Sequence, residues 1–115
     1  MKAIFLLLIL FSLSCSSEVK RSAEPKNLIP RDTFVLVLKD LTKLESYIKQ
    51  KYPTIQQSHL TSIKSSLKIF DKYNIDSSRF NKAMNYYSSR QLEMQDIYSE
   101  IIDSVNRELT ELTAK

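Results

Sequence analysis

Apolar residues recur at steps of three and four over most of the chain, a spacing that places them on one face of an α-helix. The first run of this kind begins after Pro30 and continues to about Gln50, with Asp32 as its predicted N-cap. Its apolar positions are Phe34, Leu38, Leu41, Leu44 and Ile48. We expect Tyr52-Pro53 to end this helix, because a residue that precedes proline avoids the helical region of backbone space.

The same spacing predicts a second helix, which Gln56 to Ser58 lead into and which ends at about Tyr73. Its apolar face is predicted to consist of Ile63, Leu67 and Phe70, widened by Ile69. Asn74 follows directly, and asparagine is second to glycine as the left-handed residue that ends a helix. We therefore expect a left-handed turn at Asn74, after which Ile75 folds back on the helix and Asp76 or Ser77 caps the next one.

Two further helices complete the pattern. One covers about Ser77 to Ser88 and places four residues on its inner side: Phe80, Ala83, Met84 and Tyr87. The other runs from about Arg90 towards Leu112, with five inner positions: Met94, Ile97, Ile101, Val105 and Leu112. No segment alternates apolar and polar residues long enough to predict a sheet. The expected fold is therefore all-α, a small bundle of three or four helices formed by residues 31–115.

The start of the chain has a different character. A single charge at Lys2 precedes an apolar run from Ala3 to Leu13, which is too short for a membrane span of about 20 residues. A charged start, a short apolar stretch and a small residue at the exit are typical of a secretory signal, so residues 1–14 are predicted to be a signal peptide.

Cys15 is the only cysteine and stands at the predicted cleavage point. Leu13-Ser14-Cys15 resembles the lipobox of bacterial lipoproteins, although Ser12 departs from the aliphatic residue usual in that pattern. The resemblance implies that Cys15 carries a diacylglyceryl lipid (fatty acids such as palmitate) that anchors the mature protein to a membrane. Ordinary signal cleavage near the same point is the alternative.

Residues 15–30 are rich in Ser, Lys, Arg and Pro and are predicted to form a flexible lipid tether in front of the domain. Lys20, Arg21, Lys26 and Arg31 can approach anionic headgroups, and the alternative is a solvated linker without a binding role. The chain has a formal net charge of +4, but export from the cytoplasm argues against nucleic acid as a partner.

Candidate chemistry is sparse. His59 is the only histidine, and no sequence feature selects a nucleophile or an orienting group for it, so we predict no catalytic residues. Asp96, Glu100 and Asp103 share one side of the last helix, yet calcium needs six to eight oxygen ligands. A solvated face, with Arg107 paired to Asp103, is the preferred interpretation, and we predict no metal site and no cofactor.

Two positions stand out as contact candidates. Asp40 falls at the edge of the first helix's apolar face, where it can accept a hydrogen bond from another helix, for example from a tyrosine hydroxyl; the alternative is a solvated boundary residue. Tyr86 is turned about 100° from Tyr87 and shares a stripe with Arg79 and Lys82. This stripe is predicted to be an interaction surface, and the alternative is that the cationic side chains simply cover the ring.

Several segments in fixed order are similar to one known family. They are Pro25-Lys26-Asn27-Leu28-Ile29-Pro30, Leu38-Lys39-Asp40-Leu41, Lys72-Tyr73-Asn74-Ile75, Phe80, Met84-Asn85-Tyr86-Tyr87 and Ile97-Tyr98. With them the chain resembles the Bacteroidota lipoprotein family catalogued as domain of unknown function 4296. Asn74 replaces the family's usual glycine, and Ala83 stands where serine is frequent. The resemblance implies a helical envelope lipoprotein and brings no established activity.

The function expected from these observations is non-enzymatic: an accessory or interaction subunit of a membrane-associated envelope assembly, with an envelope protein as partner. The alternative is a module that binds a small ligand or cell-wall fragment through Arg79, Lys82 and Tyr86; an enzyme ranks third. Surface-export signals of this bacterial group place acidic residues just after the lipidated cysteine, and Ser16 to Lys20 contain one. We therefore expect an outer-membrane anchor with the domain facing the periplasm.

Overall fold

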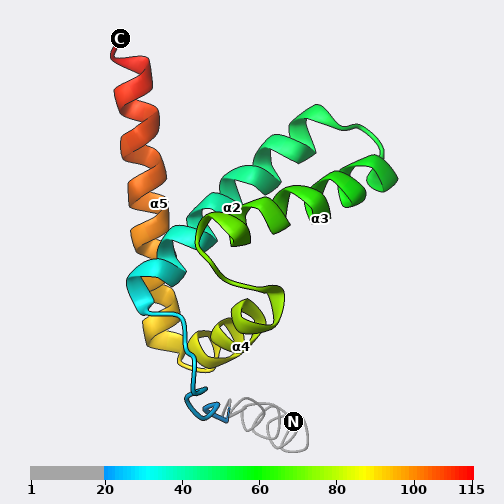
Figure 1. The fold of residues 1–115 in the computed structure, drawn as a ribbon. Helices are drawn as coiled ribbons and strands as arrows, with labels where there is room; N and C mark the ends of the chain where they lie inside the picture. The colour runs from blue at the N-terminus through cyan, green and yellow to red at the C-terminus, as the bar shows by residue number, and fades with distance from the viewer. Residues whose placement is uncertain (1–19) are drawn as a thin grey trace, which may run out of the picture.

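The computed structural model of the chain describes residues 20–115, and the regular secondary structure within that range is all helical, without a strand. The helices are α2 (Arg31–Lys51), α3 (Ile55–Lys72), α4 (Ser77–Ser88) and α5 (Gln91–Thr113) (Figure 1). The prediction of a small all-α bundle of three or four helices is confirmed, and the number of helices in the described residues is four. The predicted signal peptide and Cys15 lie outside the described residues. In the described part, no helix is both long and apolar enough to be a candidate membrane span.

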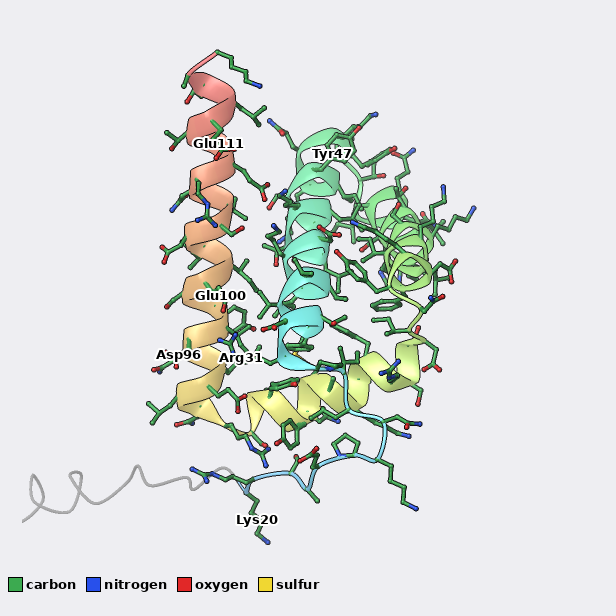
Figure 2. All side chains as sticks on the ribbon, turned by 60° about the vertical axis from the view of Figure 1, so that its left-hand side comes forward. Lys20, Arg31, Tyr47, Asp96, Glu100 and Glu111 are labelled. Carbon is green, nitrogen blue, oxygen red and sulfur yellow. The ribbon has the colours of Figure 1, made fainter. Side chains whose placement is uncertain are left out.

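Helix α2 is the centre of the arrangement. It packs against α3 along one side and against α5 along the other, and α4 crosses beneath them (Figure 2). Helices α2 and α3 form an antiparallel hairpin through the short connection at residues 52–54 (Figure 1). The chain enters at the α4 end, near Lys20, whereas Tyr47 and Glu111 mark the opposite end (Figure 2). The molecule thus has an end where the chain enters and a far end made by α2, α3 and α5.

The helix starts differ slightly from the prediction. Helix α2 begins at Arg31 after Pro30, with no side-chain cap, so the assignment of Asp32 as N-cap is wrong. Asp32 lies in the first turn instead, where its negative charge interacts favourably with the positive end of the helix dipole. Helix α3 begins one residue before Gln56, because the Thr54 hydroxyl accepts a hydrogen bond from the backbone N–H of Gln57. Asp76 caps α4 as predicted, accepting from the N–H of Arg79 at 2.7 Å.

Asn74 ends α3 in the predicted left-handed conformation, with φ of 53°. Its N–H donates to the carbonyl of Asp71 at 3.1 Å, and the N–H of Ile75 donates to the carbonyl of Phe70 at 3.0 Å. These two bonds define a Schellman motif, which satisfies the last carbonyls of the helix. Ile75 is buried, so the turn also folds the chain back onto the core as expected.

Aromatic rings form the centre of the core. The Phe34 ring of α2 lies 4.5 Å from the Tyr87 ring and 5.9 Å from the Phe80 ring, both on α4. The Phe70 ring of α3 lies 5.0 Å from that of Phe80. The predicted inner positions of α4 are confirmed, with Phe80, Ala83 and Tyr87 buried and Met84 packed against the core.

The predicted inner face of α3 is wrong for two of its positions. Ile63 and Leu67 are each 47% exposed, and Phe70 alone of the predicted stripe is buried. The side of α3 that is partly covered carries small polar residues and one isoleucine: Ser58, Thr61, Ser62, Ser65, Ser66 and Ile69. Small side chains let two helices approach closely, and this pairing turns the larger apolar residues outward.

The end of α5 also departs from the prediction. Met94, Ile97 and Ile101 are buried as expected, and Val105 packs against the edge of the core. Leu112 was predicted inside but is 74% exposed. Periodicity identifies an apolar face and gives no information on how far a partner helix follows it.

The segment before α2 is bound to the domain rather than free. Ile29 is fully buried, and its carbonyl accepts a hydrogen bond from the Tyr87 hydroxyl at 2.7 Å. Arg79 Nε donates to the carbonyl of Asn27 at 2.9 Å, and the N–H of Ser22 donates to Ser89 Oγ at 2.9 Å. The prediction of a flexible tether over residues 15–30 is therefore wrong for residues 22–30, which are fixed along α4.

Candidate interaction site

An open, apolar cleft separates the far halves of α2 and α5. Its volume is about 270 Å³. Helix α2 contributes Thr42, Lys43 and Ser46, and α5 contributes Val105, Glu108, Leu109 and Leu112. A smaller hollow of about 240 Å³ shares Glu108 and Leu112 with it and continues towards Lys115. The cleft is thus a feature of the molecular end opposite the chain entry.

The apolar wall of the cleft belongs to a longer seam on α5. Five residues recur at alternating steps of four and three: Tyr98, Ile102, Val105, Leu109 and Leu112. Val105 is partly buried and the other four are exposed. Alternating steps of four and three define the a and d positions of a coiled coil, the positions that contact a second helix. This seam lies beside the buried stripe Met94–Ile97–Ile101, so α5 carries one apolar face for the core and another that no described residue covers fully.

A cluster of charges holds the two walls of the cleft together. Glu108 accepts hydrogen bonds from Lys43 Nζ and, at 2.9 Å, from Lys39 Nζ, which also donates to Ser104 Oγ at 3.2 Å. Hydrogen bonds from Lys43 and Lys39 lower the pKa of Glu108 to about 2, so the carboxylate is charged at neutral pH. The two lysines and one carboxylate leave a net charge of +1 at the edge of the cleft, beside its apolar wall.

Asp40 joins α2 to the end of α3. Its Oδ2 accepts hydrogen bonds from the Tyr73 hydroxyl and from Lys72 Nζ, both at 2.8 Å. The contact with a tyrosine hydroxyl, which the sequence left open, is thereby found. Burial alone raises the pKa of Asp40, but hydrogen bonds from Lys72 and Tyr73 outweigh it and hold the pKa below its ordinary value. The geometry is that of an interhelical support, because both donors come from the chain itself.

The predicted stripe of Arg79, Lys82 and Tyr86 is largely occupied by contacts within the molecule. Arg79 holds the carbonyl of Asn27, as described above. The Tyr86 ring is partly buried and packs edge-on against Tyr87, and the guanidinium of Arg90 lies 3.6 Å from its centre. The expectation of an outward Tyr86 flanked by Arg79 and Lys82 is therefore wrong; Lys82 is exposed. A role for the stripe in binding stays a prediction.

Arg90 is a contact residue that the sequence did not reveal. Its Nη1 donates to the carbonyls of Ser22 and Tyr86, at 3.2 and 2.9 Å, while its guanidinium covers the Tyr86 ring. The four-residue step from Tyr86 to Arg90 was a possible signal, but the two residues belong to different helical segments. Glu108, Lys39 and Lys43 were missed because their pairing depends on the packing of α5 against α2.

The acidic side of α5 shows one interhelical ion pair. Arg31 Nη1 lies 2.9 Å from Glu100 Oε2, and the two side chains meet between α2 and α5 (Figure 2). Asp96 lies on α5 one turn before Glu100 (Figure 2). No group of three or more potential metal ligands occurs among residues 20–115. His59 is exposed on α3.

Comparison with known proteins gives one result. A family model described as "Domain of unknown function (DUF4296)" matches residues 25–111. No curated protein and no solved structure matches the chain. The match runs from Pro25 in the bound segment through α2, α3 and α4 and along α5 to Glu111, which is most of the chain, so the chain belongs to this family.

Proposed function

We propose that this member of the DUF4296 family is a lipid-anchored envelope protein that binds an amphipathic helix of a partner protein in its α2–α5 cleft. The observation that carries the proposal is the seam on α5, where apolar side chains at steps of four and three stand largely uncovered along an open cleft. A helix with its own apolar stripe is the natural complement of such a seam. The activity proposed is therefore recognition and assembly rather than catalysis.

The charge pattern around the seam restricts the partner's chemistry. The flanking positions on the side of α5 away from α2 are Ser99, Asn106 and Thr113, none of which is charged. On the other side, Glu108 is already paired with Lys39 and Lys43. Partner choice by charged flanking residues is thus weak at this site. We expect a partner helix with an apolar stripe and neutral flanks.

The anchor belongs to the same proposal. Cys15 follows a short apolar run with the features of a secretory signal, and its surroundings resemble a lipobox. Residues 22–30 are fixed on α4, so only Ser16 to Arg21 connect the lipidated cysteine to the bound part of the chain. Six residues span at most about 20 Å when extended. The anchor would therefore hold the domain close to the membrane, with its cleft at the end away from the chain entry.

Site-specific photo-crosslinking in cells tests the cleft. A photoreactive phenylalanine analogue at position 109 lies in the seam, and the same analogue at position 107, which is exposed on the opposite face of α5, is the matched control. We expect a discrete adduct from position 109 alone, whose crosslinked peptide maps to an amphipathic helix of another protein. Leu112→Asp should abolish this adduct without changing the melting curve, because Leu112 is already mostly exposed.

Two results would contradict the proposal. Equal adducts from positions 109 and 107 would mean that the seam has no special role. An adduct formed only with a second copy of this chain would replace the proposed partner by self-association.

A further inference from the structure

Helix α3 carries an apolar stripe on its outer side. Leu60, Ile63 and Leu67 recur at steps of three and four and are 57%, 47% and 47% exposed. The same stripe continues into Phe70, which is buried against Phe80 of α4. The exposed residues therefore continue the line of buried Phe70 along α3, beyond the part of this helix that α4 covers.

The charges around this stripe are mainly positive. Helix α3 contains Lys64, Lys68 and Lys72, and its one acidic residue, the exposed Asp71, lies at the Phe70 end of the stripe. Lys64 and Lys68 are exposed and lie on one border of the stripe. An apolar face bordered by lysines is the pattern of a helix that lies in the interface of an anionic membrane.

The position of the stripe agrees with this chemistry. The contact between Phe70 and Phe80 shows that the stripe side of α3 is the side on which α4 lies. The chain enters along α4, where residues 22–30 are bound. Exposed Lys20, Arg21 and Lys26, offset in part by exposed Glu24, give that entry a net positive charge. Helix α2 lies between α3 and α5, so the stripe and the seam of α5 are on different sides of the molecule (Figure 2).

We infer that α3 lies on the surface of an anionic membrane, with Leu60, Ile63 and Leu67 in the interface and Lys64 and Lys68 against lipid headgroups. The inference rests on the proposed function for one point, the lipid at Cys15 that brings the domain to the membrane. A six-residue connection of at most about 20 Å keeps α3 within reach of that surface. With α3 on the lipid, α5 is the helix farthest from it, and the α2–α5 cleft stays accessible to a partner.

Tryptophan fluorescence of the full lipidated chain tests this placement, because the chain contains no tryptophan of its own. Ile63→Trp reports on the stripe, and Leu112→Trp, at the far end of α5, is the matched control. In vesicles of phosphatidylethanolamine and phosphatidylglycerol, we expect the reporter at position 63 to shift to shorter wavelength and to be quenched by lipids brominated in their acyl chains. The reporter at position 112 should emit at the same wavelength with vesicles as it does in aqueous solution without them.

Charge is tested in the same assay. Lys64→Gln with Lys68→Gln should lower the ratio of docked to undocked α3 about 30-fold, from about 1 kcal/mol for each lysine near an anionic surface. High salt should have a similar effect, since it screens surface charges. Thermal melts of each variant establish that the fold is retained.

The outcomes separate this inference from the proposed function. An unshifted reporter at position 63 in vesicle-bound protein overturns the inference, whatever the crosslinking at position 109 shows. Equal docking on neutral vesicles overturns the assignment to an anionic surface, and a concentration-dependent shift without vesicles shows a second copy on the stripe instead. Failure of the chain to sediment with vesicles, together with absence of fatty-acid labelling, refutes the anchor and therefore the premise.

Discussion

Replacing Tyr87 by phenylalanine should loosen the segment that precedes α2. The Tyr87 hydroxyl donates to the carbonyl of Ile29 at 2.7 Å, and both residues are almost completely buried. Burial raises the pKa of Tyr87 above its ordinary value, so the hydroxyl stays protonated and available as a donor. Tyr87→Phe leaves the ring packing intact but removes the donor from a buried carbonyl, which costs about 1–3 kcal/mol. For a domain of this size each kcal/mol lowers Tm by roughly 4–8 °C.

Tyr86, the residue before Tyr87, is the control position. Tyr86 is partly buried, and no hydrogen bond is recorded for its hydroxyl within the described part of the chain, so Tyr86→Phe should change the free energy of unfolding by at most a few tenths of a kcal/mol. Urea melts give the free energies, and limited trypsin digestion reports cleavage after Lys26, which should accelerate in Tyr87→Phe alone. Identical melts and identical cleavage for the two variants would refute the claim that this bond fixes the segment.

Three further predictions follow from other parts of the structure. Asn74→Gly should be tolerated, whereas Asn74→Val should destabilise the domain by about 1 kcal/mol or more, because a β-branched residue fits poorly at a φ of 53°; a thermal melt decides it. The pKa of Asp40 is lower in the folded chain than its ordinary 3.8, so its stabilising effect is present above that pH and is lost as pH falls through the folded pKa. The difference in unfolding free energy between wild type and Asp40→Asn should therefore shrink in acid, and a constant difference would exclude the ion pair with Lys72 as its source. Cys15→Ser should abolish labelling by a fatty-acid probe and release the protein from membranes or leave an uncleaved precursor; unchanged labelling would end the lipoprotein proposal.

The sequence was informative where a signal is local. Asn74 and Ile75 form a turn through their own backbone conformation and hydrogen bonds. Asp76 caps α4 by accepting a hydrogen bond from the N–H of Arg79, three residues further along the chain. Each of these signals acts within one turn of helix, so it does not depend on how the helices pack. The spacing of Phe80 and Tyr87 also gave the buried face of α4 correctly.

Signals that depend on packing were less reliable. On α3 the spacing predicts that the largest apolar residues form the inner face, yet the partly covered side carries mainly serine and threonine. A hydrophobic stripe indicates which residues share a face, but two short helices can also pair through small residues whose backbones come close. The segment at residues 22–30 was misjudged for a related reason. Its composition is that of a linker, and its attachment depends on Tyr87, Arg79 and Ser89, which are distant in the sequence.

At the candidate site, too, one feature is visible in the sequence and another depends on how the helices pack. The spacing of Val105, Leu109 and Leu112 is visible in the sequence, but their exposure depends on how far α2 follows α5. Lys39 and Lys43 of α2 reach Glu108 of α5 where the apolar contact between these two helices has ended. Partly exposed ion pairs of this kind contribute little to stability, typically about 0–1 kcal/mol.

The exposed apolar residues discussed above form two separate surfaces, the stripe of α3 and the seam of α5. Soluble monomers rarely expose contiguous apolar patches without a binding role. Here the stripe of α3 and the seam of α5 lie on different sides of α2, and neither is needed to complete the aromatic core around Phe34. Because the two surfaces do not overlap, occupation of one leaves the other open. A domain resting on lipid through α3 would therefore present its α5 seam to a partner without first having to leave the membrane.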